Sequence, residues 1–211
     1  MTDASCGAAE AVARAQRISK DSTLDPGPVY WLGSGDYAPF YTEHGGLVDF
    51  PWTSNEAAEK AGYHRVSDCA GFAICWCWKL RRHRPGFNKG PWASVEDDIN
   101  VNSAMEDAVH HQELFEEVHP SLVRPGDLLC YPTIKLKGFK QPFIGHVSIV
   151  LDISPKYVAG AYSKLLVAHC HGPNGRRPAV TQNMGLHWEE RDKQWPKPEH
   201  RTHVIRPKER P

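Results

Sequence analysis

The sequence predicts one α+β domain in which a helix packs against a central antiparallel sheet. Segments with helical patterns dominate the first half of the chain, and short apolar strands separated by turns dominate the second half. Elements that are segregated in this way are typical of the α+β class. The chain has 211 residues, of which 40% are hydrophobic, and this is enough to bury one core. We therefore expect a helical extension at 1–20, a single domain at 21–206 and a tail at 207–211.

Helices are expected in four segments of the first half. Alanines interrupted by Glu and Arg predict an amphipathic helix at 7–18, and "TSNEAAEKAGYH" at 53–64 favours a short helix. The polar stretch 94–118 is expected to hold one or two helices. The clearest start signal is Asp68, a candidate N-cap before "CAGFAICWCWKL", and the basic "KLRRHR" indicates where that helix ends.

Four apolar segments after residue 120 predict the sheet. Turn residues and β-branched side chains mark "VRPGDLLCYP", "FIGHVSIVLDI", "SKLLVAHCHG" and "RTHVIRP" as strands. Consecutive strands of this kind favour an antiparallel meander. Asp127, in the Pro-Gly-Asp turn before the first strand, is expected to fix that turn through its side chain. Cys130 on the same strand is expected to be a buried thiol.

Composition argues against several classes of function. Lys plus Arg equals Asp plus Glu at 25 each, so no net field would draw the protein to nucleic acid or to anionic lipid. No apolar run has the length of a transmembrane span, and the N-terminus lacks the apolar core of a signal peptide. We expect synthesis in the cytoplasm without a general export signal, no membrane anchor, and free thiols instead of a disulfide framework.

Cys69 has the sequence environment of a reactive thiol. It would lie in the first helical turn after Asp68, where unpaired N–H groups and the helix dipole stabilise a thiolate. A thiolate nucleophile needs a base, and the base needs a group that orients it. His146 starts one predicted strand and His169 lies near the end of the next, so antiparallel pairing would place both imidazoles at one edge. A sulfur-to-imidazole distance of about 3 to 4 Å is expected for a working pair.

Four blocks in the order "DCAGF", "RPGDLLCY", "GHVSIVLD" and "LLVAHCHG" resemble the NlpC/p60 superfamily, the papain-like cysteine peptidases of bacterial cell walls. The resemblance implies a papain-like fold in which Cys69 is the nucleophile, His146 the general base and His169 the third catalytic member. It implies neither a cofactor nor a metal. The upstream segment "PVYWLGSGD" is similar to a family segment near the substrate, which nominates Tyr30 as a substrate contact.

Residues beside the catalytic positions are also expected to contact substrate. These are Asp68 and Ala70, which flank the nucleophile, and His171, which shares a strand face with His169. Family members carry Ser where this chain has Ala70, so a hydroxyl contact to the substrate peptide is missing. His171 and Asn174 also compete with His169 for the third catalytic position.

The resemblance implies a hydrolase of amide bonds in peptidoglycan stem peptides, most often the bond between γ-D-glutamate and a diamino acid. The stem peptide would be the partner, and nucleic acid would not. A phage lysin, a tail enzyme or an injected effector would reach the cell wall without a signal peptide. The sequence does not identify an immunity or delivery partner. The first alternative is an acyltransferase or another amidase on the same fold.

The remaining cysteines favour packing over chemistry. Cys75 and Cys77 would point about 120° and 80° away from Cys69 on a helix, among apolar neighbours. With "HCH" at 169–171 they could instead supply a zinc site, which would make the protein a non-catalytic binding module. Cys6 is expected to be inert in a mobile N-terminus.

Overall fold

The computed structural model describes residues 6–20, 29–30, 66–80, 99–135, 137, 140, 142–172, 180–195 and 197–208. Its centre is an antiparallel six-stranded sheet in the order β3-β8-β4-β5-β6-β7. These strands are β3 (Phe115–Val118), β4 (Leu128–Tyr131), β5 (His146–Ile153), β6 (Leu165–Cys170), β7 (Val180–Met184) and β8 (His203–Pro207). A separate parallel pair joins β1 (Val29–Tyr30) to β2 (Val66–Ser67).

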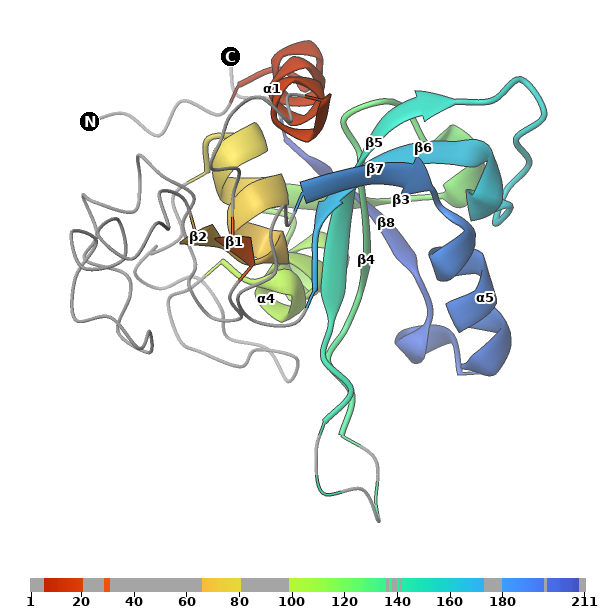
Figure 1. Cartoon of the computed structure of the whole chain (residues 1–211). Helices are drawn as coiled ribbons and strands as arrows, with labels where there is room; N and C mark the ends of the chain where they lie inside the picture. The colour runs from red at the N-terminus through yellow and green to blue at the C-terminus, as the bar shows by residue number, and fades with distance from the viewer. Residues whose placement is uncertain are drawn as a thin grey trace, which may run out of the picture.

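Helices lie on both sides of the large sheet, as Figure 1 shows. One side holds α1 (Ala8–Lys20), η1 (Gly71–Cys77) and α4 (Val101–Glu106), which continues as η2 (Asp107–His111). The other side holds α5 (Leu186–Gln194). Short 3-10 turns are η3 (Pro120–Leu122), η4 (Tyr162–Lys164) and η5 (Pro198–His200). This mixture of helices and antiparallel sheet confirms the expected α+β class.

Side-chain alternation along the strands divides the core into two clusters. The cluster on the η1 side includes Phe72, Ile74, Trp78, Leu128, Val147, Ile149, Ala168 and Cys170. The cluster on the α5 side includes Leu129, Tyr131, Val150, Leu165, Val167 and Trp188. Neighbouring residues of a strand face opposite sides, so His146 and Ser148 share the face of Val150. The sheet thus separates the η1 face from the face that carries His146.

The helix expected after Asp68 is present and begins with a side-chain cap. Oδ1 of Asp68 accepts a hydrogen bond from the Gly71 amide at 2.7 Å, which satisfies one donor of the first turn. The segment is helical from Cys69 and has π-type geometry over Gly71–Cys77. All residues of η1 except Trp76 are buried, so packing on the sheet stabilises this helix.

The N-terminal helix belongs to the core, which corrects the expectation of a mobile N-terminus. Ala11 and Ala15 of α1 are fully buried, and α1 contacts η1 and strands β5 to β7. Cys6, just before α1, is also buried, and its Sγ donates a hydrogen bond to the Cys77 carbonyl at 3.0 Å. The apolar face of α1 therefore covers part of the sheet together with η1.

Two strands and one helix differ from the sequence-based expectation. Residues 115–118 form strand β3, although they end a segment that was expected to be helical, while 101–111 are helical as expected. Strand β7 and helix α5 were not predicted. The short helix expected at 53–64 lies outside the described residues.

The C-terminal tail starts later than expected. Pro207 pairs with Phe115 in the sheet, and the Lys208 amide donates to the Leu114 carbonyl at 2.7 Å. Among the described residues, no helix has the length and apolar character that crossing a membrane requires.

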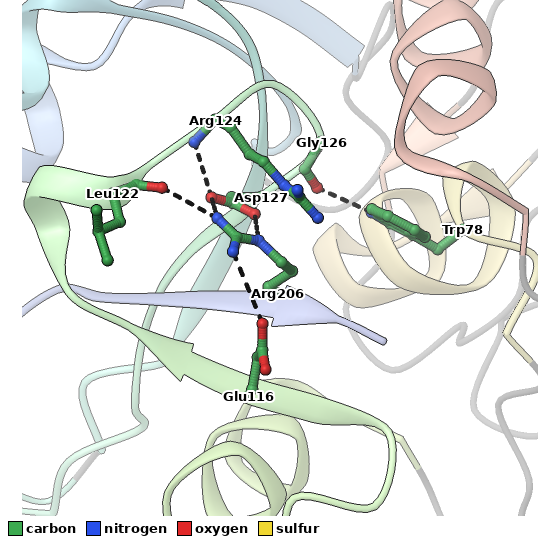
Figure 2. Close-up of polar contacts among 7 residues, drawn as sticks. All are labelled: Trp78, Glu116, Leu122, Arg124, Gly126, Asp127 and Arg206. Atoms are coloured by element: carbon green, nitrogen blue, oxygen red, sulfur yellow. Dashed lines mark hydrogen bonds and ion pairs between the residues drawn. The ribbon is translucent and has the colours of Figure 1, made fainter. Parts of the chain in front are cut away.

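An ion pair between Asp127 and Arg206 stabilises the turn that leads into β4. Asp127 accepts hydrogen bonds from Nε and Nη2 of Arg206 at 2.7 and 2.9 Å, and from the Arg124 amide at 2.8 Å (Figure 2). Arg206 lies on β8 and also donates to the Leu122 carbonyl at 3.0 Å. The expected turn-fixing role of Asp127 is confirmed.

The same turn is tied to η1 and α1. Nε1 of Trp78, which directly follows η1, donates to the Gly126 carbonyl at 3.0 Å (Figure 2). Gly126 has a φ of 96°, and a Cβ at this position would lie 2.8 Å from Cβ of Ala8. Only glycine combines this backbone angle with such a close approach. The turn therefore fixes β8, η1 and α1 relative to one another.

We predict that Asp127→Ala lowers the free energy of unfolding by about 3–5 kcal/mol, because it leaves the guanidinium of Arg206 without its buried partner. The matched control is Glu116→Ala, which removes a half-exposed carboxylate 3.7 Å from the same guanidinium. That change should cost less than about 1 kcal/mol. Urea unfolding monitored by circular dichroism measures both, and equal losses would contradict the structural role assigned to Asp127.

Candidate active site

The structure brings His146 and His169 into direct contact. His146 is the first residue of β5, and His169 lies one residue before the end of β6. Nε2 of His146 and Nδ1 of His169 are 2.9 Å apart, within hydrogen-bond distance. The two rings meet edge to face, with centroids 5.2 Å apart. The antiparallel pairing of β5 and β6 thus places both imidazoles at one edge of the sheet, as the sequence predicts.

His169 also contacts Asn183, a residue that the sequence analysis did not single out. Nδ2 of Asn183 on β7 lies 2.9 Å from Nε2 of His169, so His169 has a polar partner on each ring nitrogen. Asn183 was not singled out because strand β7 was not predicted. A polar residue one strand beyond this pair of histidines can be recognised only once the strand order is known.

His171 lies beside this row of polar contacts. Its ring stacks on His169 with centroids 4.2 Å apart, and its Nε2 is 3.0 Å from the Thr181 hydroxyl on β7. His169, and not His171, is the residue that bonds to His146. Asn174, the other rival for the third position, lies outside the described residues.

The surroundings of His146 favour its neutral form. Trp188 of α5 stacks on the imidazole, with centroids 5.5 Å apart and an angle of 18° between the planes. Burial holds the pKa of His146 well below its usual range, and the neighbouring His169 and His187 lower it further. A neutral imidazole near pH 7 can accept a proton, which a general base requires.

Cys69 lies at the start of its helix, over the same end of the sheet. It is buried and belongs to the cluster on the η1 side. Burial raises the pKa of Cys170 on β6 well above its usual value, and Cys69 lies close enough to raise it further. Burial also raises the pKa of Tyr131 to about 12, and Cys69 contributes in the same direction. Cys69 thus acts on Tyr131, which pairs with His146 across the sheet, and on Cys170, which directly follows His169.

The structure does not join the sulfur to the imidazole. The hydrogen bond of His146 goes to His169, and its ring contacts go to His169, Tyr131 and Trp188. The described residues give no hydrogen bond between His146 and the Cys69 sulfur. The expected distance of a working pair therefore stays a prediction.

The predicted substrate contacts surround Cys69 along the chain. Ala70 is buried beside it, and Asp68 is the cap described above. Tyr30 pairs with Ser67 in the parallel ladder of β1 and β2, and Ser67 precedes Cys69 by two residues. This pairing brings the upstream segment to the start of the helix that carries Cys69.

Comparisons with known proteins give no assignment. No family model, curated protein or solved structure matches this chain. Its chemistry must therefore be inferred from its own residues.

A hydrogen-bonded bridge from α4 positions the backbone of His146. Oδ1 of Asn102 accepts from the Thr133 amide at 2.9 Å, and Oγ1 of Thr133 accepts from the Gly145 amide at 2.9 Å. A Cβ at Gly145 would lie 2.8 Å from the Tyr131 carbonyl oxygen. In the sequence, the Gly before His146 indicates this close approach of two backbone segments. Nothing in the sequence around Asn102 or Thr133 predicts their part in the bridge.

The remaining cysteines are buried thiols. Cys75 and Cys77 are 2% and 0% exposed, which agrees with the packing role expected for them. Burial raises the pKa of Cys77 and of Cys130 well above the ordinary thiol value. Within the described part of the chain, no group of three or more His, Cys, Asp or Glu side chains is placed to hold a metal ion.

We predict that His146 makes the stability of the protein depend on pH. Its pKa is lower in the folded state, so below about pH 6.5 the unfolded chain binds more protons and stability falls as pH falls. One such group contributes a slope of up to about 1.4 kcal/mol per pH unit. Unfolding experiments between pH 8 and 5 should show a smaller slope for His146→Gln than for wild type. The control is His110→Gln at an exposed site, and identical slopes in all three proteins would contradict the prediction.

Proposed function

We propose that the protein is a papain-like cysteine hydrolase that cleaves amide bonds in peptidoglycan stem peptides. Cys69 is the nucleophile, His146 the general base and His169 the residue that orients this base. The observation that supports the proposal is the hydrogen bond between His146 and His169, where β5 begins and β6 ends. The four ordered sequence blocks that resemble NlpC/p60 enzymes support the substrate class, and the γ-D-glutamyl–diamino acid bond is the preferred target.

In the proposed mechanism each ring nitrogen of His146 has its own role. Nε2 faces His169, which leaves Nδ1 to accept the proton from the Cys69 thiol. The thiolate then attacks the amide carbonyl, and N–H groups at the helix start stabilise the oxyanion. The protonated His146 gives its proton to the departing amine as the C–N bond breaks. Water, deprotonated by the same imidazole, attacks the thioester and releases the acid and the free thiol.

Asn183 completes the row by fixing the tautomer of His169. For Nδ1 of His146 to act as base, its Nε2–H must donate to Nδ1 of His169. The proton of His169 is then on Nε2, which needs an acceptor. Rotation of the Asn183 carboxamide by half a turn exchanges Oδ1 with Nδ2. The oxygen then occupies the position of Nδ2, 2.9 Å from Nε2 of His169, and can accept this proton. Asn183 is thus a positioning residue.

The first test is digestion of purified peptidoglycan, with the fragments identified by mass. Wild type should release fragments with a new amine terminus at the diamino acid, and Cys69→Ala should release none, because the nucleophile is lost. Cys75→Ala is the matched control, since it removes a buried thiol from the same helix. Equal release by wild type and Cys69→Ala would exclude the mechanism. Added amine acceptor distinguishes hydrolysis from acyl transfer.

The second test compares two variants of Asn183. Asn183→Asp keeps an oxygen acceptor and should retain activity, with the acid limb of the kcat/KM profile displaced to higher pH because a carboxylate stabilises protonated imidazole. Asn183→Leu removes the acceptor and should lower kcat by about tenfold or more. Melting temperatures verify that both variants fold. A Leu variant as active as the Asp variant, with an unchanged pH profile, would remove Asn183 from the site.

A further inference from the structure

A pocket that is separate from the proposed catalytic residues lies between α5 and the segment that leads into β5. Its volume is about 240 Å³, slightly below the range of about 300–1,000 Å³ that is typical of sites for drug-sized ligands. The described residues that line it include Arg191 and Trp195 but neither Cys69 nor His146. The pocket can therefore take a small molecule without involving the thiol or the imidazole of the proposed reaction.

Arg191 places a buried positive charge in this pocket. It is 8% exposed, and its guanidinium lies 3.6 Å from the centroid of the Tyr131 ring. Its Nη1 donates a hydrogen bond to the His200 carbonyl, and the Tyr131 hydroxyl also interacts with the guanidinium. Neither oxygen carries a charge, because the first is a carbonyl and burial raises the pKa of Tyr131 to about 12. A guanidinium has five N–H donors, so these partners leave donors for a ligand.

No carboxylate of the described residues balances the charge of Arg191 in direct contact. Asp192 acts on Arg191 from a longer distance, and its Oδ1 accepts hydrogen bonds from the amide and the hydroxyl of Thr202. Glu190 lines the pocket but is exposed, so solvent and salt screen its charge. Buried charges are normally paired, and Arg pairs with a carboxylate through two parallel hydrogen bonds. A ligand with one carboxylate would complete such a pair.

Large apolar side chains lie next to Arg191 in the pocket and are open to a ligand. Phe143 and Ile144 are 38% and 46% exposed, and Phe143 meets Trp195 edge to face with centroids 5.1 Å apart. The backbone of Trp195 is fixed, because its amide donates to the Arg191 carbonyl at 3.1 Å and its carbonyl accepts from Nε of Arg201 at 3.2 Å. A ligand that covers these side chains removes apolar surface from water, which favours binding.

We propose that this pocket is a binding site for a small monocarboxylate. Arg191 holds the carboxylate, and the apolar group of the ligand packs on Phe143, Ile144 and Trp195. One negative charge matches the one buried cation, and the volume of the pocket limits the apolar group to a short chain or a single ring. The site goes beyond the proposed hydrolase activity and does not depend on it.

Four small molecules test the ligand class on the full chain. Hexanoate carries the carboxylate and an apolar chain, hexanamide replaces the carboxylate by a neutral amide, hexylamine reverses the charge, and acetate lacks the chain. We expect hexanoate to bind at least about tenfold more tightly than each of the others, because each of them loses the charged pair or the apolar contact. Titrations followed by NMR chemical shifts measure the affinities. Absent binding of hexanoate, or equal binding of all four molecules, would overturn the inference, whether or not the protein hydrolyses peptidoglycan.

Variants of α5 test the role of Arg191. Arg191→Gln should weaken the binding of hexanoate by about tenfold or more, and Arg191→Lys should retain part of the affinity, because it keeps the charge without the fork of donors. The matched control is Lys193→Gln, which removes a positive charge from the same helix. The Lys193 side chain is 68% exposed and does not line the pocket, so this change should leave binding unaltered. Melting temperatures verify that the variants fold. Equal affinities of wild type and Arg191→Gln would contradict the assignment.

His187, which also lines the pocket, reports where the ligand binds. Partial burial and the charge of Arg191 lower the pKa of His187, while Glu190 acts in the opposite direction. A carboxylate on Arg191 offsets the positive charge and should therefore raise the pKa of His187. An NMR pH titration of the imidazole signals with and without hexanoate measures this change, and His187→Gln identifies the signal. An unchanged pKa of His187 in the presence of saturating hexanoate would place the ligand elsewhere and overturn the site.

Discussion

The antiparallel pairing of β5 with β4 and β6 is the constraint on which the site depends. It fixes His146 opposite Tyr131 and brings the start of β5 to the end of β6, where His169 lies. The same pleat sends Val147 and Ile149 to the face that η1 covers. The helix that carries Cys69 and the imidazoles therefore belong to opposite faces, and their side chains can approach each other only around the end of the sheet.

The face that carries His146 combines close packing with a row of polar contacts. Trp188 is fully buried against it, and within the described part of the chain its Nε1 has no hydrogen-bond partner, nor has the buried Oγ of Ser148 on β5. Such unsatisfied groups cost stability. A weakly polar setting keeps His146 neutral, while its contact with His169 fixes its orientation. Packing and a row of polar contacts thus combine to hold a neutral, oriented imidazole.

The parts of the fold that the sequence predicted have strong local signals. Asp68 caps the helix that it precedes, and the turn before β4 holds the Asp127 interactions that its residues suggested. The parts that were missed lack such signals. Strand β3 reads Phe-Glu-Glu-Val with only its two ends buried, and α5 has Trp188 as its one large buried apolar residue. Their structures depend on neighbours that are distant in sequence, namely β8 for the strand and the Tyr131 face for the helix.

The sequence by itself determined the candidate chemistry: a cysteine at a capped helix start, and histidines at the adjacent ends of two strands. Local rules suffice for this, because caps and strand periodicity are read within a few residues. Only the tertiary structure decided that His169 and not His171 contacts His146, that Asn183 contacts His169, and that Arg191 and Tyr131 line one pocket. Strand register, the burial that sets the pKa of His146 and the pairing of charges all depend on contacts between remote segments.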